Sequence, residues 1–428
     1  MEHLHALYAL IGVVTVVLAL TSRKLRELPL SEPLIGMLLG VLVGPVALRL
    51  VELDDATRDG LLLEGSRLLL AWSVMAAALR YPLTDLRRVV GPVVLLLAVV
   101  MPLMAVLSGA AALLLGVPVT LAAVLGACLC PTDPVLAASV VTGDPAERDL
   151  PARLRRMLTG ESGANDGLAL PLVGVALAVA LPSAGPLEVA GRLLWEVAAA
   201  TAIGVVLGVL TGIGLRWTTK QDDLASGPRL VLTLLLAIAA LGLARVAQAD
   251  GVLAAFVAGL AYNRGVGTGD RGAQDQVDEA VNRYAVIPLF VLLGAVLPWR
   301  EWAALGWPAV VFVLGVLLVR RLPVVLALRR PLGLDRRDAA FVGWFGPVGV
   351  SAIFYVAYSM HEGVHDPRLF AGGTLAVAAS VVAFGVSATP GRLAYVRAGR
   401  AGVGNGSSDS PSSDSPGSDS ASPDRSGR

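Results

Sequence analysis

The sequence predicts an all-α polytopic membrane protein with about thirteen transmembrane helices, arranged as inverted repeats with two broken crossing helices. Of its 428 residues, 55% are hydrophobic and only 16% are charged, whereas soluble domains carry roughly 25% charged residues. Many apolar stretches are long enough to cross a hydrocarbon core about 30 Å thick. Two of these stretches are interrupted by proline, glycine and polar residues, which predicts that the helices break there.

Apolar stretches separated at charged, proline and glycine clusters define the candidate helices. These helices start near Leu4, Pro29, Leu61, Val89, Val117, Arg156, Leu187, Arg229, Gly251, Ala280, Ala303, Asp338 and Arg368. The last helix ends near Arg392. The first stretch follows Met1-Glu2-His3 without a basic region or a small-residue cleavage site, so we expect it to be retained as a helix.

The loop charges predict the orientation in the membrane. Alternate loops, beginning with the one that holds Arg23, Lys24 and Arg26, carry twenty Arg and Lys residues, and the intervening loops carry five. Basic loops face the cytoplasm. We therefore predict a multi-pass protein of the plasma (inner) membrane with its N-terminus outside and its C-terminus in the cytoplasm, which requires an odd number of helices.

The chain divides into a transmembrane domain over residues 1–400 and a tail over residues 401–428. The tail consists mainly of Gly, Ser, Asp and Pro, and it cannot bury enough apolar surface to offset its ordering entropy. We predict that it is a disordered cytoplasmic tail. The net charge of +1 gives no indication of a nucleic-acid partner.

Neither cysteine nor histidine spacing supports a resident metal or an enzyme. Cys128 and Cys130 form a pair that cannot complete a four-ligand zinc site. His361-Glu362-Gly363-Val364-His365 matches a zinc-protease pattern, which keeps an intramembrane hydrolase as a hypothesis. The match contains a glycine and precedes Asp366-Pro367, which should end a helix. We expect no cofactor, no metal beyond a transported cation, and no enzymatic activity.

The polar residues of greatest interest lie within two apolar segments. Pro131-Thr132-Asp133-Pro134 interrupts one segment, and Glu161-Ser162-Gly163-Ala164-Asn165-Asp166-Gly167 lies in the next. An ionisable side chain at the centre of a membrane helix costs about 2.5–3.5 kcal/mol or more, so these residues indicate function. Asp166, Asp133 and Arg320 each lie about 14–15 Å from the basic end of their helix, by the rise per residue. A shared depth predicts one site.

The residue types in this site suit an alkali cation, which prefers oxygen ligands. Candidate oxygens belong to Asp166, Asp133, Ser162 and Thr132. Glu161 and Asn165 share one stripe of their helix and Ser162 and Asp166 the next, so Glu161 can face a partner helix. Arg320 or Arg321 is its expected counter-charge. A carboxylate that binds either a proton or a metal cation couples the two fluxes in opposite directions.

These motifs resemble cation:proton antiporter family 1, which includes NhaP-type sodium/proton antiporters and animal sodium/proton exchangers. Arg320-Arg321-Leu322-Pro323-Val324 and the run from Gly343 to Val350 are also similar to family segments, so the resemblance covers about Pro29 to Pro390. It departs at Val348, where many members carry Arg.

The resemblance implies a thirteen-helix inverted-repeat fold, usually a homodimer in the lipid bilayer, that exchanges Na⁺ (or K⁺) for H⁺ by alternating access. It implies that Asp166 carries the ion and the proton beside Asn165. It places Thr132 and Asp133 in the unwound fifth helix, makes Ser162 an ion ligand, and pairs Glu161 with Arg320 in a structural ion pair. The Asn-Asp order resembles electroneutral exchangers. The alternative, a passive cation channel, needs a continuous polar pore, and no filter-like repeat is visible in the sequence.

Overall fold

The computed structural model describes residues 12–13, 16, 31–181, 185–220, 226–264 and 284–404. Within these ranges every regular element is helical. Six helices there are long and apolar enough to cross a membrane, and one bent pair of helices adds a seventh. The prediction of an all-helical multi-pass membrane protein is confirmed. The count of thirteen stays a prediction, because most of the first expected helix lies outside the described residues.

The first half of the described chain runs from the second predicted helix to the sixth. Its elements are α3 (Glu32–Val43), α4 (Asp55–Leu79), α5 (Leu83–Arg87), α6 (Val90–Leu95), the π-helical turn η1 (Leu96–Val100), α7 (Met101–Ala112), the 3-10 turn η2 (Leu113–Leu115), α8 (Val119–Cys128), α9 (Pro134–Val141), α10 (Gly143–Asp149) and α11 (Ala152–Ala180).

The second half contains the remaining spans. Its elements are α12 (Pro186–Lys220), α13 (Ser226–Val246), α14 (Gly251–Asn263), α16 (Val286–Ala295), α17 (Trp299–Leu305), α18 (Trp307–Leu314), the π-helical turn η4 (Gly315–Val319), α19 (Leu322–Ala327), α20 (Arg336–Trp344), α21 (Val350–His361) and α22 (Pro367–Gly404). Helix α22 thus passes both the predicted end near Arg392 and the predicted domain boundary at residue 400. Residues 405–428 of the predicted tail lie outside the described residues.

Helix α4 begins six residues before the apolar stretch that predicts it. The Asp54 carboxylate accepts a hydrogen bond from the Thr57 backbone N–H at 3.0 Å, which satisfies one of the unpaired donors at the helix start. The first turn is polar and largely exposed, and the buried residues begin at Leu62. A cap outside the apolar stretch therefore sets the start of this helix.

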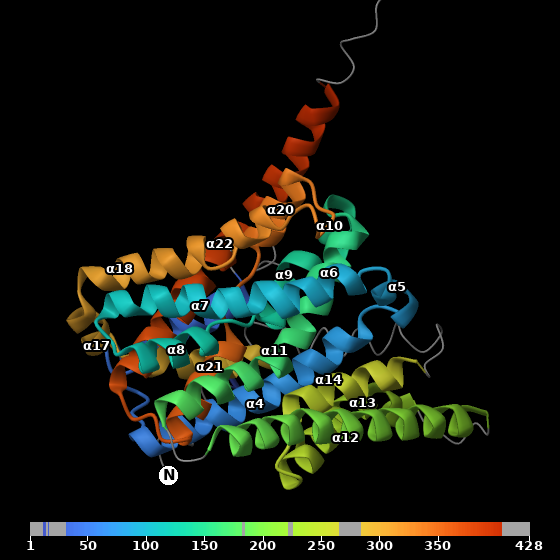
Figure 1. Cartoon of the computed structure of the whole chain (residues 1–428), viewed down its shortest axis with the longest axis horizontal. Helices are drawn as coiled ribbons and strands as arrows, with labels where there is room; N and C mark the ends of the chain where they lie inside the picture. The colour runs from blue at the N-terminus through green and yellow to red at the C-terminus, as the bar shows by residue number, and fades with distance from the viewer. Residues whose placement is uncertain are drawn as a thin grey trace, which may run out of the picture.

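The helices form two groups on either side of α11, which packs against members of both (Figure 1). Helices α4, α12, α13 and α14 pack together along one edge, and α6, α7 and α18 lie along the other. Only 17% of the most apolar window of α12 is buried. The lipid-facing surface therefore lies on the outer helices, while α11 and its polar residues are in the interior.

Two membrane segments are discontinuous, as the sequence predicts. Residues 129–133 separate α8 from α9, and residues 345–349 separate α20 from α21. Both non-helical stretches are buried. Irregular backbone at membrane depth is tolerated only where protein or a cavity surrounds it, so these two breaks define where the polar chemistry of the fold is concentrated.

Candidate functional site

The two breaks are joined directly through Asp133. Its backbone N–H donates to the Pro347 carbonyl at 2.9 Å. One carboxylate oxygen accepts from the N–H groups of Val135 and Leu136, at 2.7 and 2.9 Å, and the other accepts from the Val350 N–H. A single fully buried carboxylate therefore caps the first turns of both α9 and α21, where the helix dipoles favour negative charge.

The approach of the two breaks requires a glycine at residue 349. A Cβ atom added to Gly349 would lie 2.3 Å from the Asp133 Oδ2 atom and 2.7 Å from its Cγ atom. Neither neighbour is the free end of a flexible chain, because Asp133 is held by three backbone N–H groups. The glycine therefore permits the carboxylate to cap α21.

Helix α11 brings the remaining predicted residues to the first break. The Asn165 side-chain amide donates to the Thr132 hydroxyl at 2.7 Å, which ties α11 to the stretch between α8 and α9. The Ser162 hydroxyl donates to the Thr159 carbonyl of its own helix at 3.4 Å. All of these side chains are at most 3% exposed. The structure therefore brings Asn165 to Thr132, next to Asp133, while Ser162 is buried one turn earlier on α11.

Asp166 differs from its neighbours because its carboxylate oxygens lack hydrogen-bond partners in the described part of the chain. It is 0% exposed, and neither of its carboxylate oxygens has a hydrogen-bond partner among the described residues. The Asn165 Oδ1 atom and the Ser351 hydroxyl are likewise buried without a partner in that part of the chain. Asp133 lies within electrostatic range of Asp166. The site is thus an oxygen-rich interior with one unpaired acid.

The sequence did not single out two residues that contact this region. The hydroxyl of Tyr355, on α21, donates to the backbone carbonyl of Asp166 and fixes α21 against α11. Ser351 lies close to the Asp166 carboxylate, although no hydrogen bond joins them. Ser351 belongs to the interrupted run after Gly346, and its position there is a signal that could have marked it; Tyr355 carries no such signal.

The structure corrects the predicted ion pair. Glu161 pairs with Arg321, not with Arg320: both guanidinium nitrogens of Arg321 donate to the Glu161 carboxylate, Nη2 to Oε2 at 2.7 Å. Both side chains are 2% exposed. The Nε atom of Arg321 also donates to the Val342 carbonyl at 3.0 Å. The fork of donors thus satisfies a buried carboxylate with two parallel bonds.

Arg320 instead donates hydrogen bonds to backbone carbonyls in the two breaks. Its guanidinium donates to the carbonyls of Leu129 and Pro131, the latter at 3.3 Å, and to the carbonyl of Gly346. These carbonyls lie at or just beyond the C-terminal ends of α8 and α20. A cation stabilises the negative end of a helix dipole, so Arg320 complements Asp133, which caps the opposing helix starts.

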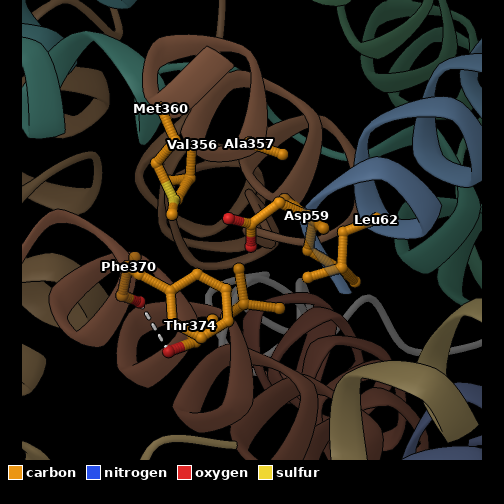
Figure 2. Close-up of a pocket in the computed structure, with 10 residues that line it drawn as sticks. Asp59, Leu62, Val356, Ala357, Met360, Phe370 and Thr374 are labelled. Atoms are coloured by element: carbon orange, nitrogen blue, oxygen red, sulfur yellow. Dashed lines mark hydrogen bonds between the residues drawn. The ribbon is translucent and has the colours of Figure 1, made fainter. Parts of the chain in front are cut away.

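A small pocket lies between α4, α21 and α22 (Figure 2). Asp59, Met360 and Phe370 are among its lining residues. The Thr374 hydroxyl donates to the Phe370 carbonyl at 2.6 Å, and Asp59 is paired with Arg58. Ile353, two residues beyond Ser351 on α21, is also among its lining residues. The pocket therefore extends along α21 from Ile353 to Met360.

Comparison with known proteins identifies the family of the chain. The family model described as "Sodium/hydrogen exchanger, transmembrane" matches residues 11–391. The chain is 31% identical over 372 residues to Na(+)/H(+) antiporter 2 of Zygosaccharomyces rouxii, a match covering 82% of this chain and 45% of that protein. It is 29% identical over 367 residues to the Na(+)/H(+) antiporter of Saccharomyces cerevisiae, covering 82% and 37%. The chain therefore spans less than half the length of these two yeast relatives.

The fold is similar to a solved archaeal transporter. The structure of the sodium proton antiporter MjNhaP1 from Methanocaldococcus jannaschii aligns with a TM-score of 0.67 and 19% identity, covering 94% of this chain and 98% of that one. A second structure of the same protein aligns with a TM-score of 0.72. The fold likeness accompanies a family match over most of the chain, and this chain belongs to the sodium/hydrogen exchanger transmembrane family.

Proposed function

We propose that this chain is a secondary active antiporter that exchanges Na⁺ for H⁺ at Asp166. The observation that carries the proposal is the buried Asp166 carboxylate, whose two oxygens have no hydrogen-bond partner among the described residues. Burying an unpaired charge is costly. The cost falls when the carboxylate holds a proton or a cation, and it cannot hold both at once.

The ligand set of the proposal consists of oxygen atoms near Asp166. Asn165 Oδ1 and the Ser351 hydroxyl are unpartnered in the described region, and the Ser162 and Thr132 hydroxyls retain acceptor capacity. Asp133 already accepts three backbone N–H groups. We therefore assign two roles to Asp133: its negative charge attracts the cation, and its hydrogen bonds hold the two breaks in place. Asp166 is the first residue to which we assign direct coordination of the cation. K⁺ is the alternative cargo.

Exchange follows because Asp166 holds either Na⁺ or a proton, and never both at once. If the site faces each side of the membrane in turn, Na⁺ leaves on one side only when a proton takes its place, and the proton leaves only where Na⁺ replaces it. One carboxylate that carries one monovalent ion in either direction moves no net charge, so the exchange is electroneutral. The yeast relatives described as Na(+)/H(+) antiporters support this cargo.

The proposal includes the assembly and the topology. We propose a thirteen-helix inverted-repeat domain over residues 1–400, a cytoplasmic tail over residues 401–428, an outside N-terminus, and a homodimer in the plasma (inner) membrane. The opposed breaks of α8–α9 and α20–α21 support the inverted repeat, because interrupted helices at corresponding positions of two halves are typical of such transporters.

Transport in vesicles tests the function. The purified protein is reconstituted, an inward Na⁺ gradient is imposed, and internal pH is followed with the membrane potential clamped. We expect the interior to become alkaline at a rate that does not depend on the clamped potential. Cation current that follows the potential without proton movement would instead identify a passive channel, and replacing Na⁺ by K⁺ decides the cargo.

A further inference from the structure

Helix α22 lies against the second break along several of its turns. The Ser380 hydroxyl accepts a hydrogen bond from the Val348 N–H, inside the break, at 2.8 Å. The indole N–H of Trp344 donates to the Ser387 hydroxyl at 3.1 Å, and the Trp344 and Phe384 ring centroids are 5.4 Å apart. Side chains of α22 therefore accept a hydrogen bond from a backbone N–H of the break and contact Trp344 at the end of α20.

Beyond Pro390 the same helix makes a second set of contacts. Arg392 Nε pairs with Asp149 Oδ2 at 2.8 Å, and the Tyr395 hydroxyl donates to Asp338 Oδ1 at 2.7 Å. Arg337 lies 3.7 Å above the Tyr395 ring centroid. We call Arg392, Asp149, Tyr395 and Asp338 the clasp. Tyr395 is 6% exposed, and the side chains of Arg392 and Asp149 are 13% and 26% exposed, so the clasp is a partly buried contact.

Gly391 allows the clasp to close. A Cβ atom at this position would lie 2.8 Å from the Phe345 ring, so the backbone of α22 rests directly on the first residue of the break. Phe345 is followed by Gly346, whose carbonyl accepts from Arg320. Phe345 therefore lies between the segment of α22 that carries the clasp and the contacts that hold the two breaks together.

The clasp joins α10, the short helix that follows the first interrupted segment, to α20, the first half of the second. Asp149 ends α10, which follows α9 after Thr142, and Asp338 lies in the first turn of α20. Figure 1 shows the end of α22 emerging beside α10 and α20. Both elements belong to the end of the molecule that the basic loops assign to the cytoplasm. The contacts of α22 thus connect the helix that follows α9 with the start of α20, the helix that precedes the second break.

We propose that Arg392 and Tyr395 are positioning residues for ion binding, which act by keeping the two breaks in one relative arrangement. The contacts between Asp133 and the second break, to Pro347 and Val350, depend on how α9 and α20 sit relative to each other. Without the clasp, the arrangement that binds the cation is populated for only part of the time. Apparent affinity falls in proportion to that fraction. The inference rests on the proposed antiport.

The test compares transport kinetics of full-length variants in vesicles. We expect Arg392→Ala, Asp149→Ala and Tyr395→Phe each to raise the apparent KM for Na⁺ by about threefold or more, with the maximal rate per protein changed less than twofold, as for a lost binding-competent fraction. A merely structural role would lower the amount of folded protein and leave KM unchanged. The charge exchange Arg392→Asp with Asp149→Arg restores KM toward the wild-type value.

Arg368→Ala is the matched control, because it removes an ion pair at the opposite end of α22. Arg368 pairs with Asp366 at 2.7 Å and contacts neither break, so KM should not change. If the wild-type protein exchanges Na⁺ for H⁺ and KM is unchanged in all three clasp variants, the inference is overturned. If the wild-type protein does not exchange Na⁺ for H⁺, the proposed function is overturned, and with it the role of the clasp in ion binding.

Amide hydrogen exchange gives a readout that does not depend on transport. Loss of the clasp should speed exchange over residues 345–350 in Arg392→Ala relative to Arg368→Ala. Equal rates in these two variants would show that the clasp does not hold the break. If Arg392→Ala does not fold, the same comparison is made with Tyr395→Phe, which removes a single oxygen atom.

Discussion

Asp166 is the residue on which transport is expected to depend. Asp166→Asn keeps the size and shape of the side chain but removes the charge, so the variant should fold and lose Na⁺-driven proton movement completely. Melting temperature in detergent and transport in vesicles measure the two effects separately. Glu147→Gln, which neutralises a carboxylate that is 63% exposed, is the control and should transport normally. Exchange by Asp166→Asn at the wild-type rate would exclude this carboxylate as the carrier.

The corrected ion pair makes a second prediction at the same scale. Removing Glu161 alone or Arg321 alone leaves a buried unpaired charge, at a cost of about 3–5 kcal/mol in unfolding free energy. The double variant Glu161→Ala with Arg321→Ala should cost less than the sum, with a coupling of about 0.5–3 kcal/mol. A matched cycle of Glu161→Ala with Arg320→Ala should show a smaller coupling, because no hydrogen bond joins these two side chains in the structure. Coupling to Arg320 that equals or exceeds coupling to Arg321 would contradict the structure.

Single residues could be predicted from sequence where their position on a helix decided the contact. The spacing of Glu161, Asn165 and Asp166 predicts that Glu161 faces a partner helix, and Glu161 does pair with Arg321. It could not choose between Arg320 and Arg321, because counting residues gives depth and not direction. Tyr355 was also inaccessible to sequence reasoning, since its hydroxyl contacts a backbone carbonyl that no residue type reveals.

At the scale of helices, the breaks were predictable because prolines and glycines disrupt helices wherever they occur. The π-helical turns were not, since a shift in backbone hydrogen bonding leaves no compositional trace. One of these turns, η4, ends at Val319, and the Arg320 N–H donates to the Gly315 carbonyl at 3.0 Å. A π-turn inserts a residue and changes which side chain faces which neighbour. Counting residues along a regular α-helix therefore does not give the directions of the Arg320 and Arg321 side chains, which follow this turn.

The packing of the two breaks predicts the effect of a single methyl group. Gly349→Ala places a Cβ atom against the Asp133 carboxylate, so Asp133 must release the Val350 N–H. Overpacking of this kind costs about 1–3 kcal/mol, and the lost cap adds about 1 kcal/mol. Thermal unfolding should show this loss together with reduced transport. Gly242→Ala in α13, where no atom lies within 4 Å of the added Cβ, should be neutral or slightly stabilising.

At the scale of the whole molecule, apolar segments and loop charges determine much of the predicted architecture because the bilayer constrains every span in the same way. Helices in the described ranges correspond to the predicted segments from Pro29 to Arg368. Their packing around α11 could not be predicted, since it depends on side-chain contacts between segments far apart in the sequence. The orientation rests on charge alone, and it is the property of the whole chain that most needs a direct test.

Cysteine labelling in intact cells tests that orientation. Glu52 lies in the exposed connection before α4, and Glu147 is exposed on α10; the loop charges place the first outside and the second in the cytoplasm. The native Cys128 and Cys130 are 0% exposed, so an impermeant maleimide should not reach them. We expect Glu52→Cys to be labelled in intact cells and Glu147→Cys only after permeabilisation. The reverse pattern would invert the topology and place the clasp on the outer face of the membrane.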